Sequence, residues 1–542
     1  MDPNQKIKTA KTYKLVFLII IGALITFTLL YTLHPGKFKI TQCSYVNRAA
    51  KIQPDYSGTF IPPNIAPLNF LIMETGSRYF VRIYSQKGNP IEIFSNTGKI
   101  AIPYQAWHKL LNTNRANQLY FDIYVKNPPD KSSLESNHNQ WLHFQTVVNT
   151  ISSDNIDDFL VYRKIRPTHR IWRDMGIYQR NLNSFDESLI LHNGYFKHGC
   201  LNCHTFCNNR TDKMLLGIRS AGYGSSALLV EDDKVKKINA KFGYTSWHPS
   251  GKIAAFSVNE VRQLFHSSAP KVRDVMDFDS LIAYYLVNSK TIKTSPKLAD
   301  KNRLETYPAW SPDGRYLYFC SAPITWQDRT VVPQSYNQIK YDLVKISYDL
   351  ESDRWGELET VLSANDTDLS ILLPRISPDG RWLLFCMCNY GYFPVYQRSS
   401  DLYMTDLREA EQTGQYNYRR LDINSNDSES WHSWSSNSQW IAFSSKRQSG
   451  VFTRIYLAYV DEKGEVHKPI LLPQKDPAYY DSCLWTFSVP ELVIEPVRVR
   501  KEKIGRVVRS SQKISADMPI TMATPKAGAP PGHDEPWQSG HE

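Results

Sequence analysis

Between about residues 212 and 493 the chain repeats one pattern of apolar and polar positions. Each copy has an apolar strand end, a tight turn built on Ser-Pro-Asp-Gly or a variant of it, and a strand in which apolar residues alternate. Proline sets φ at the first turn position, and Asp-Gly readily adopts the backbone conformations of the remaining turn positions. Each copy therefore predicts a β-hairpin. Most copies are followed by a further strand and turn. The copies are Trp247–Phe256, Trp310–Phe319, Ile376–Phe385 and Trp434–Phe443.

Four strands in each of several consecutive repeats are typical of a β-propeller. Successive copies begin 63, 66 and 58 residues apart. A propeller blade needs only about 40–45 residues, so this spacing leaves room for inserted loops of about 15–20 residues. Apolar stretches on both sides of the copies can supply an incomplete first and last blade. We therefore predict a mainly β chain with a five- to six-bladed propeller over residues 212–493.

The segments on either side of the repeats have different patterns. Within residues 55–151, short runs with a period of two alternate with turn residues, which predicts a small β-sandwich-like domain. Residues 152–211 are mixed and are expected to form a connecting segment that carries a cysteine cluster. Residues 494–542 lose the periodicity and become rich in Ala, Pro and Gly towards the end, which predicts a flexible basic tail.

The N-terminal residues are expected to anchor the protein in a membrane. Residues 15–33 form a 19-residue run without a charge, just long enough for one transmembrane helix. Residues 1–14 carry a net charge of +3 and are predicted to stay in the cytoplasm by the positive-inside rule. The sequence before residue 35 lacks the small residues of a signal-peptide cleavage site. We expect a single-pass protein of the bacterial inner membrane, with the bulk of the chain in the periplasm.

Composition agrees with a folded chain, because 42% of the residues are hydrophobic and 13% are aromatic. The net charge of +11 is concentrated at the two ends. Residues 498–513 contribute +6, and about +2 remains for everything between the two basic ends. A basic surface for nucleic acid is therefore not expected on the folded part.

One motif carries recognisable chemistry. Residues 200–204 read Cys-Leu-Asn-Cys-His, which is the attachment signature of a c-type haem. The thiols of Cys200 and Cys203 would bond the two vinyl groups, and His204 would be the proximal ligand of the iron. A single motif predicts one haem. The predicted sixth ligand is Met214, ten residues beyond His204.

Other interpretations of the cysteine cluster stay open. Cys200 could form a disulfide with Cys203 or with Cys207, as an oxidising compartment permits. The same cysteines with His204 could also hold a metal ion, although adjacent ligands suit one ion poorly. Met175, His192 and His198 precede the motif and are further sources of an iron ligand. We find no catalytic constellation, so a substrate reaction is not expected.

Several segments resemble a known bacterial family. The Ser-Pro-Asp-Gly hairpins are similar to those in the propeller of the Tol-system protein TolB. More closely, residues 157–493 resemble TolB-like propeller proteins with one haem signature ahead of the propeller, which are often labelled cytochrome c biogenesis or Tol-like proteins. The matching segments are Met175–Arg180, Cys200–Phe206, Trp247–Gly251, Leu373–Gly380, Trp431–Ser438, Phe443–Arg447 and Leu472–Pro477.

The resemblance implies a TolB-like propeller with haem attached at Cys200 and Cys203 and iron bound by His204. Residues 487–493 depart mildly from the family's pattern near the end of the propeller, which affects the closure of the last blade. We therefore expect a membrane-anchored, extracytoplasmic c-type cytochrome whose propeller docks a redox or envelope protein. The alternative is a non-redox TolB-like interaction module in which the cysteine cluster is a disulfide or a metal clip.

Overall fold

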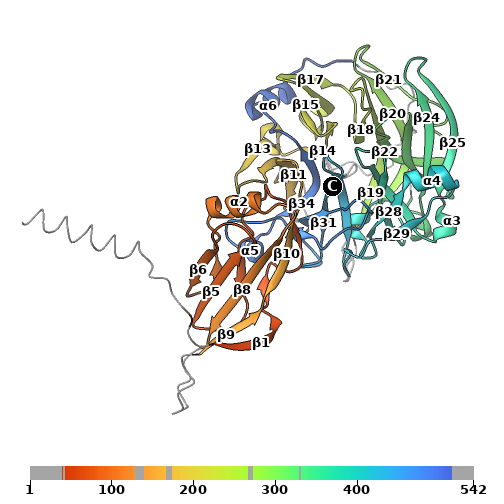
Figure 1. Cartoon of the computed structure of the whole chain (residues 1–542). Coiled ribbons are helices and arrows are strands. Elements are labelled where there is room, and N and C mark those ends of the chain that lie inside the picture. The colour runs from red at the N-terminus through yellow and green to blue at the C-terminus, as the bar shows by residue number, and fades with distance from the viewer. Residues whose placement is uncertain are drawn as a thin grey trace, which may run out of the picture.

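The computed structural model describes residues 40, 43–127, 140–166, 174–265, 273–328 and 331–515, and these residues form two packed β-rich parts (Figure 1). The predicted cytoplasmic end, residues 1–14, and the predicted anchor, residues 15–33, lie outside these ranges. None of the helices in the described ranges is both long and apolar enough to cross a membrane. The anchor and the membrane location remain predictions.

The N-terminal part is a small domain of two sheets and one helix, in agreement with the predicted β-sandwich. It begins at residue 43, ahead of the expected boundary at residue 55, because β1 pairs in parallel with β9. Alternate residues of β5 and β8 point into a shared core, as the period of two predicts. The larger sheet contains β1 (Cys43–Ala49), β3 (Phe60–Ile61), β5 (Arg78–Tyr84), β6 (Ile91–Ser95), β8 (Gln118–Lys126), β9 (Trp141–Gln145) and β10 (Val147–Ile151). The smaller sheet contains β2 (Ile52–Gln53), β4 (Phe70–Ile72) and β7 (Lys99–Ile100), and the helix is α2 (Tyr104–Thr113).

The second part is a propeller of six four-stranded blades (Figure 1). Blade 1 contains β34 (Thr486–Val493), β11 (Phe159–Ile165), β12 (Met175–Asn181) and β13 (Glu187–His192), and blade 2 contains β14 (Cys200–Cys207), β15 (Arg210–Ser220), β16 (Gly224–Glu231) and β17 (Lys234–Ile238). Blade 3 contains β18 (Gly243–Trp247), β19 (Ile253–Phe265), β20 (Arg273–Leu286) and β21 (Thr291–Lys293), and blade 4 contains β22 (Arg303–Trp310), β23 (Tyr316–Pro323), β24 (Asp342–Asp349) and β25 (Arg354–Leu362). Blade 5 contains β26 (Ser370–Ile376), β27 (Trp382–Cys388), β28 (Asp401–Asp406) and β29 (Tyr418–Arg420), and blade 6 contains β30 (Glu429–Trp434), β31 (Trp440–Ser445), β32 (Arg454–Tyr459) and β33 (Ile470–Leu471).

The ring closes between the two ends of the propeller sequence. Strand β34, the last of the propeller, pairs antiparallel with β11, the first, and becomes the innermost strand of blade 1. The propeller therefore has six blades, the upper of the two predicted numbers. The propeller begins at residue 159 rather than 212, so most of the predicted connecting segment, residues 152–211, consists of propeller strands. The first blade lacks the Ser-Pro-Asp-Gly turn, so the sequence gives no signal for its strands β11, β12 and β13.

The repeated turns also connect neighbouring blades. Gly314, in the turn of blade 4, has φ +75°, and its carbonyl oxygen lies 3.1 Å from Nε2 of His248 in the equivalent turn of blade 3. A β-carbon at position 314 would lie 2.4 Å from that ring nitrogen. Glycine is therefore required there both by the backbone conformation and by the neighbouring blade.

The chain after β34 is partly folded, which corrects the predicted flexible tail of residues 494–542. Helix α6 (Lys501–Arg509) buries Ile504 and Val508 against blades 1 and 2. The ammonium of Lys237, on β17, donates hydrogen bonds to the carbonyl oxygens of Val508 (2.7 Å) and Ser510 (3.1 Å), so it caps the C-terminal end of the helix. Residues 516–542 lie outside the described ranges.

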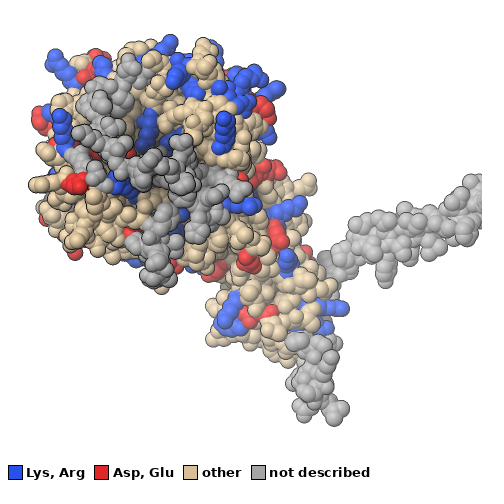
Figure 2. All heavy atoms as spheres, turned by 180° about the vertical axis from the view of Figure 1, so that it is seen from behind, with Lys and Arg blue, Asp and Glu red and all other residues tan. Residues whose placement is uncertain are grey.

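The N-terminal domain docks against blade 6. The ring of Phe60 stacks on that of Tyr459 at 4.8 Å, and Tyr56 Oη donates to the carbonyl oxygen of Leu471 at 3.3 Å. The side-chain amide of Asn69 donates to the carbonyl oxygen of Lys475 at 2.9 Å. Figure 2 shows the molecule from behind, with acidic and basic side chains interspersed over both parts in this view.

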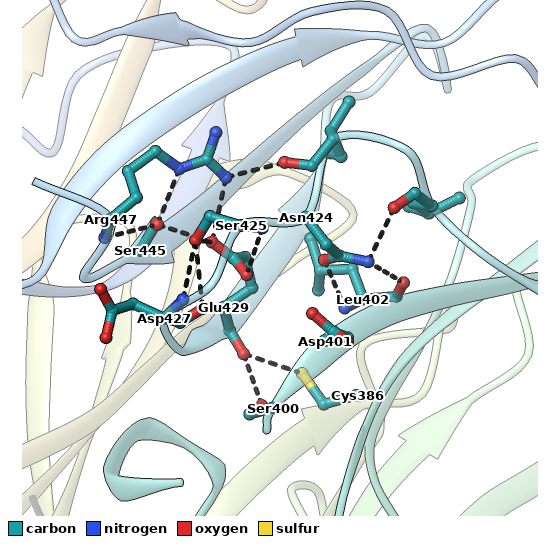
Figure 3. A network of polar contacts seen from close by, with 12 residues as sticks. Cys386, Ser400, Asp401, Leu402, Asn424, Ser425, Asp427, Glu429, Ser445 and Arg447 are labelled. Atoms are coloured by element: carbon teal, nitrogen blue, oxygen red, sulfur yellow. Dashed lines mark hydrogen bonds and ion pairs between the residues drawn. The ribbon is translucent and has the colours of Figure 1, made fainter. Parts of the chain in front are cut away.

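A buried carboxylate organises the start of blade 6 (Figure 3). Glu429 is fully buried, and its oxygens accept hydrogen bonds from the hydroxyls of Ser425 and Ser445, both at 2.7 Å, and from Arg447 Nη2 at 3.0 Å. Its carbonyl oxygen accepts the hydroxyl of Ser400 at 2.6 Å from blade 5. The network therefore joins blade 6 to blade 5. The remaining short helices are η3 (Asn193–Phe196), η4 (Tyr336–Gln338), α3 (Ala364–Thr367), η5 (Pro394–Tyr396), α4 (Leu407–Thr413) and α5 (Tyr479–Ser482).

Candidate functional site in the central channel

The innermost strand of every blade carries a β-bulge at the same level of the channel. The pairing register of each inner strand shifts by one residue there, so two residues oppose one on the neighbouring strand. In five blades the first bulge residue has φ between +39° and +55°. These residues are Tyr244, Tyr307, Leu373, Trp431 and Val489, and all five line one cavity on the propeller axis.

In blade 2 the bulge is made by the end of the haem-like motif. Asn202 pairs with Gly217 and Thr205 with Leu215, so Cys203 and His204 together oppose a single residue of β15. The motif therefore lies on the innermost strand of a blade rather than in the predicted connecting segment. The bulge brings the last two residues of the motif to the level at which the other five blades line the channel.

His204 is the most unusual side chain at this level. It is 2% exposed, and neither ring nitrogen has a hydrogen-bond partner among the described residues. Burial and the nearby positive charge of Arg163 lower the pKa of the imidazole to about 3, while the carbonyl oxygens of Val161 and Val489 act in the opposite direction. The imidazole is therefore neutral, with a free nitrogen lone pair available for a ligand.

His432 occupies the equivalent place in blade 6 and makes a useful comparison. It also follows the first bulge residue, and burial lowers its pKa to about 3 as well. Its Nε2 donates to the carbonyl oxygen of Leu384 at 3.2 Å, and its Nδ1 lies 3.7 Å from the sulfur of Cys386. His432 thus forms a hydrogen bond with the preceding blade, whereas His204, which has the carbonyl oxygens of Val161 and Val489 nearby, makes no hydrogen bond of normal geometry among the described residues. Leaving a buried polar group unsatisfied costs about 1–3 kcal/mol, so the contrast needs an explanation.

The other predicted site residues divide between the channel and the blade cores. Cys200 is 7% exposed, and its sulfur lies 3.3 Å from Nη2 of Arg219. The backbone of Cys203 is at the bulge, and its side chain is outside the described part. Met214, opposite Phe206 on β15, is fully buried in the core between blades 1 and 2 and does not line the cavity with His204.

The alternatives for the cysteine cluster involve Cys207, which packs in a different core, between blades 2 and 3. Burial raises the pKa of its thiol to about 11. None of the seven cysteine side chains that the structure describes forms a disulfide. Within the same described residues, no three His, Cys, Asp or Glu side chains are placed to hold one metal ion.

The histidines and the methionine ahead of the motif are already engaged elsewhere. His192 Nε2 lies 3.0 Å from the carboxylate of Asp174, at the outer strand of blade 1. The sulfur of Met175 accepts the backbone N–H of Leu201 at 3.1 Å. His198 has φ +54° and lies outside the strands. None of the three lines the cavity beside His204.

Above the bulge level the channel widens. The cavity at His204 measures about 40 Å³, enough for two or three water molecules, and the cavity towards the C-terminal ends of the inner strands measures about 130 Å³. Arg375 lines both cavities and pairs with Glu491 at 3.2 Å. Burial raises the pKa of Glu491, and the positive charge of Arg375 opposes that shift.

The residue types gathered here are those that a covalent haem would use. A neutral imidazole with free nitrogens lies on the same strand as two cysteines, the cavity wall carries the rings of Tyr244, Tyr307 and Trp431, and Arg375 offers a positive charge for an anionic group. A cavity of about 40 Å³ is smaller than a porphyrin, so binding would require the side chains at the bulge level to move apart. Sequence reasoning found the motif but missed the ring of bulge residues.

Comparisons with known proteins agree on the type of architecture only. No protein-family model matches the chain, and no curated protein matches it. Among solved structures, it is similar to TolB from Acinetobacter baumannii, at 12% identity and a TM-score of 0.39, over 69% of this chain and 79% of that one. It is also similar to an oligogalacturonate lyase from Vibrio parahaemolyticus (11% identity, TM-score 0.28, 54% and 85%) and to hydrazine synthase from Kuenenia stuttgartiensis (14%, 0.29, 50% and 65%). The assignment as a propeller rests on the strand order described above.

Proposed function

We propose that this protein is a c-type cytochrome-like propeller that carries one haem at its central channel. The haem would be attached through Cys200 and Cys203, and His204 would be the protein's ligand to the iron. When bound, the haem would supply a one-electron redox centre. The observation that carries the proposal is the unsatisfied, buried imidazole of His204 at the bulge level, in contrast to the satisfied His432.

The chain's own residues have definable roles in this proposal. Burial keeps His204 neutral, which leaves a nitrogen free to bind a metal. The aromatic side chains of Tyr244, Tyr307 and Trp431 would provide an apolar wall for the group, and Arg375 would hold an anionic substituent. The faces of the propeller would dock a redox or envelope protein, and residues 15–33 would anchor the whole in the inner membrane with the propeller in the periplasm.

The sixth position of the iron is a separate question. Met214 packs among apolar side chains between blades 1 and 2, so it would need a movement of β15 to reach the cavity. If Met214 is the ligand, Met214→Leu abolishes the weak sulfur-to-iron band near the red end of the oxidised spectrum. If the spectrum is unchanged, the sixth position is open or filled by another residue.

The deciding experiment is a pyridine haemochrome spectrum of the denatured full-length chain, produced in cells with haem-attachment machinery. We expect one covalently retained haem per chain in the natural sequence and none in the variant Cys200→Ser/Cys203→Ser. Cys207→Ser is the matched control, since it changes a neighbouring cysteine outside the motif, and it should retain the haem. A haem-free natural chain would refute the proposal and leave the non-redox interaction module as the explanation.

A further inference from the structure

The larger sheet of the N-terminal domain has a second face that takes no part in the domain core. On β5 and β8, alternate residues such as Val81 and Ile123 are buried in that core, whereas their neighbours Phe80 and Tyr124 point to the opposite side of the sheet. Phe80 is 6% exposed, yet it packs in none of the hydrophobic cores of the described residues. We call this side of β1, β5, β6, β8 and β9, on which Phe80 and Tyr124 lie, the outer face.

A row of five aromatic rings crosses the outer face. Phe94, Phe80, Tyr124, His143 and Tyr45 are paired in register from β6 through β5, β8 and β9 to β1. The centres of consecutive rings are 4.6, 5.6, 4.2 and 5.8 Å apart, so each ring contacts the next. The two ends of the row are its most open members, with Phe94 50% exposed and Tyr45 61% exposed. The row is therefore a continuous aromatic stripe that reaches solvent.

The next row of the outer face is basic. Arg78 and Lys126 lie directly opposite each other on β5 and β8, and neither forms an ion pair with a described residue. Like charges that lie directly opposite destabilise a pair of strands, so an anionic group bound between them would relieve the repulsion. Trp141 and Cys43 continue this row across β9 and β1.

The acidic side chains beside the aromatic row are engaged within the face. Glu92 lies 3.8 Å from Arg82, and Asp122 accepts a hydrogen bond from the hydroxyl of Thr146 at 2.6 Å. They therefore leave the positive charge of Arg78 unbalanced. The chemistry of the outer face is that of aromatic side chains next to basic ones.

The start of β1 ties this face to the predicted anchor, and this step rests on the anchor of the proposed function. Only residues 34–42 separate the end of the predicted transmembrane segment, at residue 33, from Cys43. A fully extended chain covers about 3.3–3.6 Å per residue, so Cys43 would lie within about 35 Å of the membrane. Cys43 belongs to the basic row, so the chain enters the domain at that row of the outer face. The nearest large surface for the outer face is then the bilayer itself.

We propose that the outer face docks on the lipid surface of the membrane that holds the anchor. Phosphates of anionic lipids would lie at Arg78 and Lys126, and the aromatic row would lie at the level of the headgroups. Tyrosine and tryptophan favour this region because each combines an apolar ring with a polar group, and Lys and Arg are attracted to an anionic surface. Because the domain packs on blade 6 through Phe60 and Tyr56, docking would also hold the propeller in one orientation to the membrane.

The experiment reconstitutes the full-length chain in vesicles of phosphatidylethanolamine and phosphatidylglycerol that contain a lipid with a spin-labelled headgroup. A fluorophore is attached at Asn96→Cys, which directly follows β6 at the edge of the face farthest from β1, or at Gln105→Cys on α2, which packs on the core side of the sheet. Both positions are exposed and uncharged in the natural chain. Both labelled chains carry Cys43→Ser, because the thiol of Cys43 is exposed. We expect strong quenching by the spin label at position 96 and weak quenching at position 105.

The aromatic contact is tested by Tyr45→Ser/Phe94→Ser, with the label at position 96. Both side chains are at least half exposed, so the variant mainly removes apolar surface that docking would bury. It should lower the ratio of docked to undocked molecules at least about tenfold, which removes most of the quenching. Tyr418→Ser is the matched control, since this tyrosine is 40% exposed on β29 of blade 5, and it should leave the quenching unchanged.

The basic contact is tested by Arg78→Gln/Lys126→Gln. This variant removes two like charges that face each other, so the domain should be no less stable than in the natural chain. Docking on vesicles with phosphatidylglycerol should weaken about fivefold for each charge removed. On vesicles of phosphatidylcholine alone, which carry no net charge, the variant should behave as the natural chain does.

Resistance to extraction with alkaline carbonate reports on the anchor separately. If the chain resists extraction but positions 96 and 105 are quenched equally, or if neither double variant reduces the quenching at position 96, the docking proposal is wrong and the anchor stands. If carbonate extracts the chain, the anchor and the docking proposal both fail. Haem attachment is measured independently, because the outer face shares no residue with the motif.

Discussion

Glu305 of blade 4 provides a test of how burying a carboxyl group affects the stability of this fold. Glu305 lies two residues before the bulge of β22, and Glu429 occupies the equivalent position in β30. Each of the two glutamates pairs with a serine of the next strand. Blade 6 supplies Arg447 two residues beyond that serine, whereas blade 4 has Pro323 there. Glu305 is 1% exposed, and within the part of the chain that the structure describes its side chain accepts only a long hydrogen bond of 3.4 Å, from the backbone N–H of Asp300.

Burial raises the pKa of Glu305 to about 8, and the negative charge of Asp300 contributes in the same direction. In the unfolded chain the carboxyl loses its proton near pH 4.5, whereas in the folded chain it keeps the proton up to about pH 8. Between these values the folded state binds one more proton than the unfolded state, so stability falls as the pH rises. At 1.36 kcal/mol for each pH unit, this single group should remove roughly 4 kcal/mol of stability between pH 5 and pH 8.5.

The assay is urea unfolding of the natural chain and of Glu305→Gln at pH 5 and pH 8.5. Glutamine keeps the shape and cannot ionise, so the free energies of unfolding should be similar at pH 5. At pH 8.5 the variant should be the more stable by roughly 4 kcal/mol. Glu429→Gln is the control, since it loses the hydrogen-bonded ion pair with Arg447 and should be the less stable at both pH values. A difference between Glu305→Gln and the natural chain that is the same at both pH values would refute the reasoning.

Two further variants test other parts of the fold. Arg447→Met removes the positive partner of the buried Glu429 and should lower the free energy of unfolding by about 3 kcal/mol in urea titrations, because breaking a buried pair from one side leaves a charge uncompensated. A loss below 1 kcal/mol would mean that the serine hydroxyls suffice. Lys237→Met removes the C-terminal cap of α6 and should speed tryptic cleavage within Lys501–Arg509, with little effect on unfolding of the propeller. Unchanged cleavage would show that apolar packing alone holds the helix.

The sequence predicts the four blades that carry the Ser-Pro-Asp-Gly turn or a variant of it, and on either side of them it predicts only parts of the other two blades. That turn is visible because proline and glycine have narrow backbone preferences that a reader can recognise. Blade 1 is assembled from residues 159–192 and 486–493, which are far apart in the chain and joined only by the pairing of β34 with β11. Such a long-range pairing leaves no local signal. The folding of α6 was missed for a similar reason, because its apolar face is short and its stability depends on blades 1 and 2.

The position of the haem-like motif could have been found from spacing within the repeats. In blades 3, 4 and 5 the second bulge residue lies four positions before the proline of the turn, as with Pro308 and Pro312. In blade 2 the same offset of four positions separates His204 from Asn208. Asn208 has φ +52° and begins a turn. Counting back from each turn would therefore have placed Cys203 and His204 on an inner strand, at the level of Tyr307 and Pro308. The end of the haem-like motif and the bulge of β14 are the same dipeptide, Cys203–His204. Any ligand of His204 must consequently lie in the channel, where all six blades contribute to its surroundings.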